Sequence, residues 1–351
     1  TGIFMRLAAS VTLALAGAFA MPAAAAECAN PDAIGISRTI AGDPAEHPRV
    51  GSFQYPETLP LNEREIVLTL DDGPRPKGSG EVLDILAREC IKATYFIIGR
   101  NAREFPDLLR RMQAAGHTIG THTQNHPLIF DRAAAARIEK EVQDGIASVE
   151  SVLGPNSVAP FFRIPGLLRS DAAESYLASK NLMLWSTDVL AHDWKRRINE
   201  AGIVRRAIDR LEAKGNKGIL LLHDIHPRTV AALPLLLREL KRHNYRFVHV
   251  TVASADNPKT ETDPQQWAFK QPTRPVLPAI TLTDLKDLNG NLREQTQMSG
   301  IDYCGNKAGS TRLAKRIAHR RAAWRRGHAR PASAARAARI PAQHAAAAPR
   351  T

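Results

Sequence analysis

Residues 68–74, Leu-Thr-Leu-Asp-Asp-Gly-Pro, decide the fold, because an apolar run that begins at Ile66 ends there on two carboxylates and a Gly-Pro break. A short, apolar, β-rich run favours a buried strand of a parallel sheet. Two adjacent carboxylates resist joint ionisation unless a positive group lies between them, and a divalent cation is the simplest such group. Asp-Gly is also a common hairpin signal, so this stretch alone fits a turn as well as a reactive loop.

The rest of the chain alternates between strand-like and helix-like segments. Apolar runs predict about seven strands, at residues 66–70, 93–98, 117–122, 159–164, 182–187, 217–222 and 246–250. Helical segments lie between them, at residues 80–90, 101–115, 131–153, 171–180, 198–214 and 229–242. This alternation predicts an α/β protein, a distorted (β/α) barrel of about seven parallel strands with right-handed crossovers and irregular N-terminal and C-terminal extensions.

Side chains that can do chemistry lie at or after the carboxyl ends of these predicted strands. They are Asp71, Asp72, His122, His126, Arg163, Asp188, Asp193, Trp194 and His223. Because the active site of a parallel barrel forms at the carboxyl ends of its strands, we expect them to converge although they span about 150 residues. Taken singly, Arg163 also fits a surface arginine, His223 a structural core histidine, and Asp193 with Trp194 a loop acid and a packing aromatic.

His122 and His126 have the spacing that places two imidazoles on one face of a helical turn, as in many zinc sites. A histidine pair alone is more often not a metal site. Adding Asp72 gives two nitrogens and one oxygen with a coordination position left open, which a hydrolytic metal site requires. This donor set suits zinc, and also cobalt or nickel, better than magnesium.

Taken together, five ordered motifs in residues 60–255 resemble the polysaccharide deacetylases, also called the NodB-homology group or carbohydrate esterase family four. The motifs are Thr-Leu-Asp-Asp-Gly-Pro at 69–74, His-Thr-Gln-Asn-His at 122–126, Arg-Ile-Pro-Gly at 163–166, Asp-Trp at 193–194 and Leu-Leu-His at 221–223. The resemblance implies that Asp72, His122 and His126 bind the metal, that Asp71 is the catalytic base and that His223 is the catalytic acid. It also implies a NodB-like barrel.

The same resemblance gives supporting roles to the other motif residues: Arg163 orients Asp71, Asp193 tunes His223, Trp194 and Leu221 wall the acetyl pocket, and a backbone N–H near Gly166 holds the oxyanion. Two departures from the family pattern stand out. Gly166 lies where an aromatic residue is usual, so a substrate-stacking platform is missing or is supplied elsewhere. Asp188 lies five residues before Asp193 instead of three, so its role is open.

By this resemblance the chain is a metal-dependent hydrolase that removes N-acetyl groups from an N-acetylglucosamine-containing polysaccharide, either peptidoglycan or a chitin-like oligomer. Metal-bound water attacks with Asp71 as base, and His223 protonates the departing amine. Two alternatives are an O-acetyl esterase acting on a xylan-type polymer and a catalytically silent carbohydrate-binding module on the same fold.

The 351 residues can hold one barrel-sized domain with appendages. We expect a signal peptide at 1–26, an irregular lead-in at 27–60, the deacetylase domain at 61–255, a polar extension at 256–304 that wraps the barrel or forms a linker, and a basic Ala/Arg-rich disordered tail at 305–351. A short positive start, a short apolar run and small residues before Glu27 predict export, to the periplasm or the medium.

Three cysteines, Cys28, Cys90 and Cys304, are left after the predicted cleavage. In an oxidising compartment we expect Cys28 to pair with Cys304 and Cys90 to remain a buried thiol, although no connectivity follows from sequence. The tail has twelve Lys and Arg and no acid, and so carries nearly all of the net charge of +13. It predicts docking to anionic envelope polymers or a membrane surface, or a solvated extension without a partner, and export argues against nucleic acid.

Overall fold

The computed structural model describes residue 28 and residues 30–271. The predicted signal peptide, the tail at 305–351, residues 272–304 of the extension and Cys304 lie outside these residues, and the predictions made for them stay predictions. No helix within the described part of the chain is long and apolar enough to span a bilayer.

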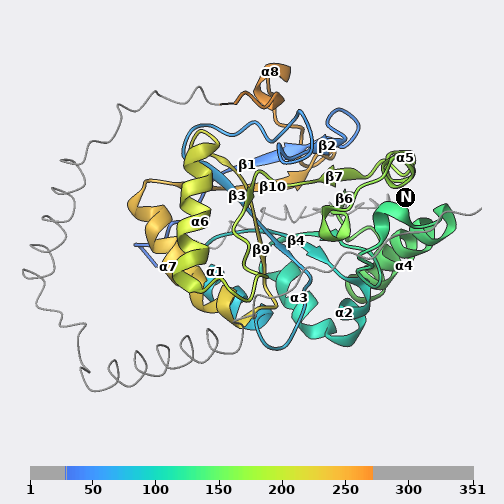
Figure 1. The fold of residues 1–351 in the computed structure, drawn as a ribbon, viewed down its shortest axis with the longest axis horizontal. Coiled ribbons are helices and arrows are strands. Elements are labelled where there is room, and N and C mark those ends of the chain that lie inside the picture. Colours follow the sequence, from blue (N-terminus) through green and yellow to red (C-terminus); the bar gives the residue numbers. More distant parts are fainter. Residues whose placement is uncertain (1–27, 29, 272–351) are drawn as a thin grey trace, which may run out of the picture. The chain divides into compact units, whose positions relative to one another are not determined.

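The described residues form a single parallel sheet flanked by helices (Figure 1). Its strands are β1 (Ile36–Gly42), β2 (Arg49–Val50), β3 (Glu65–Asp71), β4 (Thr94–Ile97), β5 (Thr118–Thr121), β6 (Phe161–Phe162), β7 (Met183–Trp185), β8 (Val189–Leu190), β9 (Gly218–His223) and β10 (Arg246–Val252). The order is β1-β10-β3-β4-β5-β6-β7-β2, and β9 pairs with both β3 and β8. All seven predicted strands are present, and the predicted α/β class with a parallel sheet is confirmed.

Strand β3 is the centre of the sheet. All seven of its residues are buried, and its apolar side chains alternate between two core clusters, with Leu68 in one and Val67 in the other. Burial on both faces explains why the sequence shows a continuous apolar run instead of an alternating one. The register of β3 with β9 places Asp71 opposite His223, so the sheet itself brings two predicted catalytic residues together.

The helices lie where the sequence predicts them, with one break. They are α1 (Ser79–Arg88), α2 (Gly99–Glu104), α3 (Pro106–Ala114), α4 (Ala135–Leu153), α5 (Asp171–Ser179), α6 (Glu200–Ala213), α7 (Pro227–Arg242) and α8 (Pro264–Trp267), with short 3-10 turns at Phe130–Arg132 and Pro165–Leu167. The single helix expected at 101–115 is two helices. Pro106 begins the second, because proline fits the first turn of a helix but not its interior.

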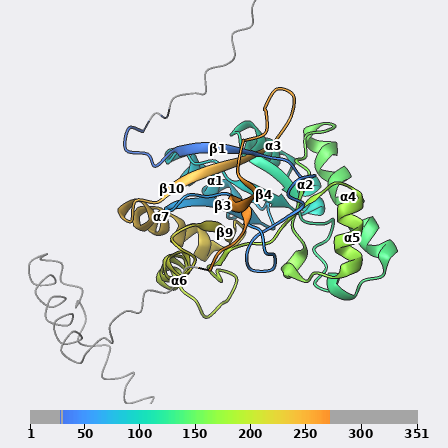
Figure 2. The ribbon, with the colours of Figure 1, turned by 90° about the horizontal axis from the view of Figure 1, so that it is seen from above.

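The lead-in is more regular than expected. Strand β1 pairs in parallel with β10 along one edge, where the two strands lie side by side in Figures 1 and 2, and β2 pairs with β7. Part of the extension also packs on the barrel. The buried Trp267 stacks on His47 with ring centroids 3.5 Å apart, so residues 256–271 wrap the domain and do not form a free linker.

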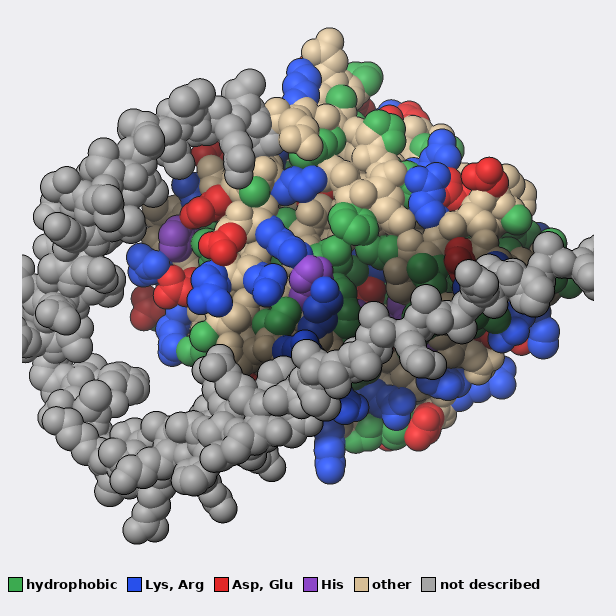
Figure 3. Space-filling view, viewed as in Figure 1, with side chains coloured by type: hydrophobic (Ala, Val, Ile, Leu, Met, Phe, Trp, Pro, Cys, Tyr) green, Lys and Arg blue, Asp and Glu red, His purple; other side chains and the backbone are tan. Residues whose placement is uncertain are grey.

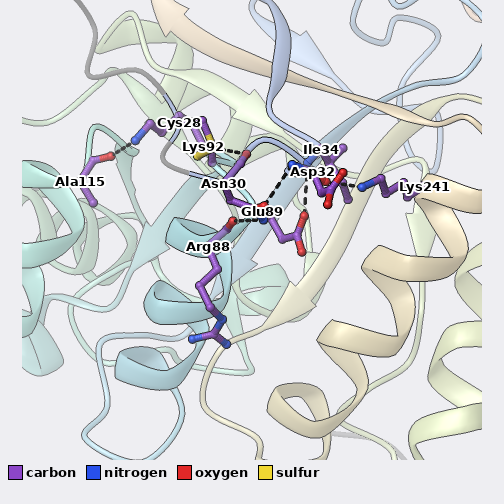
Figure 4. Close-up of a disulfide and its surroundings, with 10 residues drawn as sticks. Cys28, Asn30, Asp32, Ile34, Arg88, Glu89, Lys92, Ala115 and Lys241 are labelled. Atoms are coloured by element: carbon purple, nitrogen blue, oxygen red, sulfur yellow. Dashed lines mark hydrogen bonds between the residues drawn. A yellow bond between two sulfur atoms is a disulfide. The ribbon is translucent and has the colours of Figure 1, made fainter.

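The cysteine pairing differs from the prediction. Cys28 is bonded to Cys90, so the expected pair with Cys304 and the expected free thiol at Cys90 are both wrong (Figure 4). The segment after Cys28 lies along the end of α1: Asn30 Nδ2 donates to the Arg88 carbonyl at 3.1 Å, and the Gly35 N–H donates to the Glu89 carbonyl at 2.9 Å. These contacts bring Cys28 to Cys90, the second residue after the end of α1.

The surface is mixed in character. On the face shown in Figure 3, hydrophobic side chains gather near the middle, and lysine and arginine side chains lie around them.

Candidate active site

The predicted residues converge at the carboxyl ends of the strands. A cavity of about 500 Å³ opens there. Its lining includes Asp71 at the end of β3, Asp72 directly after it, His122 and His126 after β5, and His223 at the end of β9. Gly166, Trp194 and Leu221 also line the cavity. Arg163 and Asp193 are fully buried behind it, in contact with lining residues.

Asp72, His122 and His126 form a cluster suited to a metal ion. One donor atom from each lies within 4.8 Å of the others. The Oδ1 atom of Asp72 is 3.3 Å from His126 Nε2 and 3.6 Å from His122 Nε2, and this buried oxygen has no hydrogen-bond partner in the described residues. A buried carboxylate oxygen facing two imidazole nitrogens without a hydrogen bond fits a divalent cation.

The protonation states of this cluster also fit a cation. His122 Nδ1 donates to the Arg163 carbonyl at 2.6 Å, which leaves Nε2 with its lone pair toward the cavity. Burial lowers the pKa of His122 to about 4, against the opposing pull of Asp71, so the ring is neutral at pH 7. Burial raises the pKa of Asp72, but the nearby histidines, His223 first, bring it below its usual value. Metal ligands must be deprotonated, and these two are.

The histidine pair does not lie on a helical turn, as its spacing suggested. Residues 122–126 are a loop in which Thr123 and His126 have positive φ angles of 67° and 57°. The buried Glu141 of α4 holds this loop by accepting from the Asn125 N–H at 2.8 Å, and Thr123 Oγ1 accepts from the His126 N–H at 3.0 Å. The loop, fixed from a neighbouring helix, brings the two imidazoles to within 4.8 Å between centroids.

Arg163 fixes Asp71. Its Nη1 donates to Asp71 Oδ1 at 2.7 Å and to Thr69 Oγ1 at 2.8 Å, and its Nη2 donates to the Ser186 carbonyl at 2.7 Å. The guanidinium also lies 4.2 Å above the Phe96 ring. Nε donates to the Trp185 carbonyl at 3.2 Å, so all three guanidinium nitrogens of this buried arginine are hydrogen-bonded. The carboxylate of Asp71 is thereby held in one position, with Oδ2 3.8 Å from His122 Nε2.

His223 is held as a cation by Asp193. His223 Nδ1 lies 2.9 Å from Asp193 Oδ1, and Asp193 Oδ2 accepts from the His223 N–H at 2.7 Å and from Thr229 Oγ1 at 2.8 Å. Burial lowers the pKa of His223, but the Asp193 carboxylate outweighs it and raises the pKa to about 9. Trp194 packs edge-on against the His223 ring, with centroids 5.3 Å apart. At neutral pH the site therefore offers a protonated imidazole at its wall.

Asp188, whose role the sequence left open, forms hydrogen bonds that hold the fold together. Its carboxylate accepts from the Ser52 N–H and the Ile219 N–H, each at 2.7 Å, and from Thr58 Oγ1 at 2.7 Å. It thereby ties the lead-in to strand β9. It does not line the cavity.

Six further residues that were not among the predicted site residues line the cavity: Phe53, Leu128, Ile164, Leu167, Leu190 and His192. Phe53 comes from the lead-in, and no motif marks it. Gly166 has φ 60°, and a Cβ at this position would lie 3.1 Å from a Leu128 methyl. A side chain here is both strained and crowded, which accounts for the missing aromatic residue.

A parallel sheet with a cluster suited to a metal ion and two titratable groups fixed beside it is an arrangement that hydrolases use. A profile of the family described as polysaccharide deacetylase matches residues 58–185. The chain is 35% identical over 198 residues to a peptidoglycan-N-acetylglucosamine deacetylase of Bacillus cereus, an alignment that covers 55% of this chain and 89% of the relative. The chain therefore belongs to the polysaccharide deacetylase family of hydrolases.

A further relative and a solved structure are also deacetylases. A chitooligosaccharide deacetylase of a Bradyrhizobium species is 33% identical over 200 residues, which is 52% of this chain and 88% of that protein. Among solved structures, a peptidoglycan deacetylase of Bdellovibrio bacteriovorus superposes with a TM-score of 0.55 at 30% identity, over 64% of this chain and 62% of that chain.

Proposed function

We propose that the protein removes N-acetyl groups from an N-acetylglucosamine-containing polysaccharide, either peptidoglycan or a chitin-like oligomer. One observation carries the proposal: a buried arginine fixes Asp71 and a buried aspartate fixes His223, and both groups line the cavity that holds the ligand cluster. A base, an acid and an open metal site are the parts that amide hydrolysis needs.

The cation would be held by Asp72, His122 and His126, and zinc, cobalt or nickel suits these donors. When bound, the metal supplies a Lewis acid that polarises the acetamide carbonyl and activates a water molecule. The neutral imidazoles and the ionised carboxylate are the ligand forms this requires.

Asp71 acts as the general base in this proposal. Its Oδ1 is occupied by Arg163, so Oδ2 is the oxygen left to take a proton from the attacking water. The arginine cannot be deprotonated at working pH, so it pairs with the carboxylate throughout the reaction. A general base of this kind contributes about 10² to 10⁴-fold to the rate.

His223 acts as the general acid. An amine is a poor leaving group unless it is protonated, so the reaction needs a proton donor on the nitrogen side of the acetamide. His223 carries that proton at neutral pH because Asp193 raises its pKa to about 9. Leu221 and Trp194 would line the acetyl pocket, and a backbone N–H near Gly166 would donate to the oxyanion.

The names of the relatives support the substrate class. They act on peptidoglycan and on chitooligosaccharides, and both contain N-acetylated amino sugars. The presence of both proton-transfer groups argues against a silent binding module. The test is acetate release from N-acetylglucosamine oligomers, peptidoglycan fragments and acetylated xylan. Release from the first or second supports the proposal, whereas release from xylan alone identifies an O-acetyl esterase.

We also propose that the protein works outside the cytoplasm. A disulfide is typical of an oxidising compartment, and the Cys28–Cys90 bond agrees with the predicted export. The tail at 305–351 is then placed to bind anionic envelope polymers or a membrane surface. Equal sedimentation of full-length and tail-less protein with envelope fragments at low salt would exclude this docking.

A further inference from the structure

Large exposed apolar side chains are concentrated at the cavity. The described residues contain four of them, Phe53, Leu128, Trp194 and Leu235, which are 54%, 59%, 37% and 37% exposed. The first three line the cavity, and only Leu235 on α7 lies elsewhere. Single exposed apolar residues need no explanation, but a group of them around one cavity marks a binding surface.

The loop that carries Phe53 is fixed by hydrogen bonds of the residues before and after it. The Ser52 N–H donates to Asp188 Oδ1 at 2.7 Å, and the Phe53 N–H donates to the Thr187 carbonyl at 2.9 Å. After Phe53, Gln54 Nε2 donates to the Leu167 carbonyl at 2.8 Å, and Gln54 Oε1 accepts from Ser186 Oγ at 2.9 Å.

The next residue adds a further anchor, because the buried hydroxyl of Tyr55 donates to Glu174 at 3.1 Å. Each of these bonds is made by a neighbour or by the backbone of the loop, and none uses the Phe53 side chain. The backbone that carries the ring is therefore fixed beside the cavity, with the ring half exposed, and a ligand that covers the ring has little loop entropy to remove.

Phe53 lies in a loop next to Gly166, the position at which the aromatic residue usual in the family is missing. The contact from Gln54 to Leu167 places the Phe53 loop against the turn that contains Gly166. A side chain at residue 166 would be strained at φ 60° and would crowd a Leu128 methyl, and the glycine there supplies no aromatic ring. Phe53 precedes the family match at 58–185, so this ring comes from a part of the chain that the match does not cover.

We propose that Phe53 is a sugar-binding residue whose ring stacks on the apolar C–H face of a sugar unit in a bound oligosaccharide. This inference rests on the proposed deacetylase function. A flat aromatic ring, fixed and half exposed beside a polar site, suits a pyranose unit, which presents C–H groups on its faces and hydroxyl groups at its rim. Phe53 thus sets affinity for an oligomer without taking part in proton transfer.

The test is calorimetric binding of an N-acetylglucosamine tetramer to full-length protein in an Asp71→Asn background, which prevents turnover. We compare Phe53→Ala, Phe53→Leu, Phe53→Trp and a control, Leu235→Ala, which removes an exposed apolar side chain elsewhere. Burial of a phenylalanine predicts roughly a tenfold or larger loss of affinity for Phe53→Ala. Phe53→Leu is expected to lose most of the affinity, since it lacks a flat face, whereas Phe53→Trp and Leu235→Ala bind like the parent.

In the active protein, Phe53→Ala is expected to raise KM for the tetramer by a similar factor and to leave kcat within about twofold. Tetramer binding by Phe53→Ala within twofold of the parent overturns the inference, and so does the absence of tetramer binding by the parent. Binding that depends on Phe53 without acetate release from the wild-type protein supports the inference and refutes the proposed deacetylase function.

Discussion

Replacing Asp193 with Asn tests the assignment of His223 as the acid. Asp193 is fully buried, and its two oxygens accept from His223 Nδ1, from the His223 N–H and from Thr229 Oγ1. Asparagine keeps the shape and part of the hydrogen bonding but removes the negative charge. Burial lowers the pKa of His223, and the Asp193 charge is the largest of the contributions that raise it to about 9, ahead of those of Asp72 and Asp71.

The expected loss of kcat follows from how far the pKa of His223 falls when the Asp193 charge is removed. Without the Asp193 charge, burial is opposed only by the more weakly acting Asp72 and Asp71, and the pKa of His223 falls toward its ordinary value of about 6.5. At pH 8, an acid with a pKa of about 9 is roughly 90% protonated, whereas one with a pKa of about 6.5 is roughly 3% protonated. We therefore expect kcat at pH 8 to fall by up to about 30-fold, and the loss to shrink as the pH is lowered toward 5.5.

The assay is the pH profile of kcat for acetate release, measured between pH 5 and 10 at a matched metal load. The wild-type rate should decline as pH rises through about 9, and the Asp193→Asn rate should decline at a lower pH, toward about 6.5. Thr229→Val is the matched control, since it removes one hydrogen bond from Asp193 and leaves the charge. The Thr229→Val change should cost about 1 kcal/mol of stability without shifting the pH at which kcat declines on the alkaline side of the profile, its basic limb.

A basic limb that stays at the same pH in Asp193→Asn, with kcat lowered equally at every pH, would refute this reasoning. It would mean that Asp193 acts only by positioning and that His223 is not the group that titrates.

Four other changes have expected outcomes. Asp72→Ala should abolish binding of zinc, read as metal per chain after dialysis, and a full equivalent retained would remove Asp72 from the ligand set. Arg163→Met leaves the buried Asp71 carboxylate unpaired and should lower the free energy of unfolding, measured by urea denaturation, by about 3–5 kcal/mol. A loss below about 1 kcal/mol would contradict the buried ion pair. Cys28→Ser removes a disulfide between residues 62 apart in sequence and should lower the free energy of unfolding by about 2–4 kcal/mol, with acetate release retained. An unchanged urea midpoint would argue against the disulfide. Gly166→Ala should cost about 1–2 kcal/mol, because φ is 60° there, and a thermal midpoint equal to wild type would contradict that strain.

Much of this architecture follows from the sequence because parallel strands share an edge. The apolar run into Asp71 marks a strand buried on both faces, and the similar runs before His122, Arg163 and His223 mark other strands of the same parallel sheet. Once the strands are parallel, the residues at their carboxyl ends must meet. The convergence was therefore predictable, although the roles of the residues are still proposals.

The features that sequence reasoning missed depend on contacts between distant segments. Strands β2 and β8 have two residues each, too few to show a period. Strand β1 contains three consecutive polar residues, at 37–39, so it shows no apolar run that would predict a buried strand. The Cys28–Cys90 pair depends on how the lead-in docks on α1, which spacing does not reveal. Phe53 could not be found for the same reason, because its position depends on bonds to Thr187, Leu167 and Glu174 through its loop.

The most direct test of the central claim is acetate release by zinc-loaded wild-type protein and by Asp71→Asn, with bound zinc measured in the same samples. The account predicts that both proteins hold one zinc per chain and that Asp71→Asn loses about 10²-fold or more in kcat, because the base is removed and the ligands remain. Comparable rates from the two proteins at equal zinc content would contradict it.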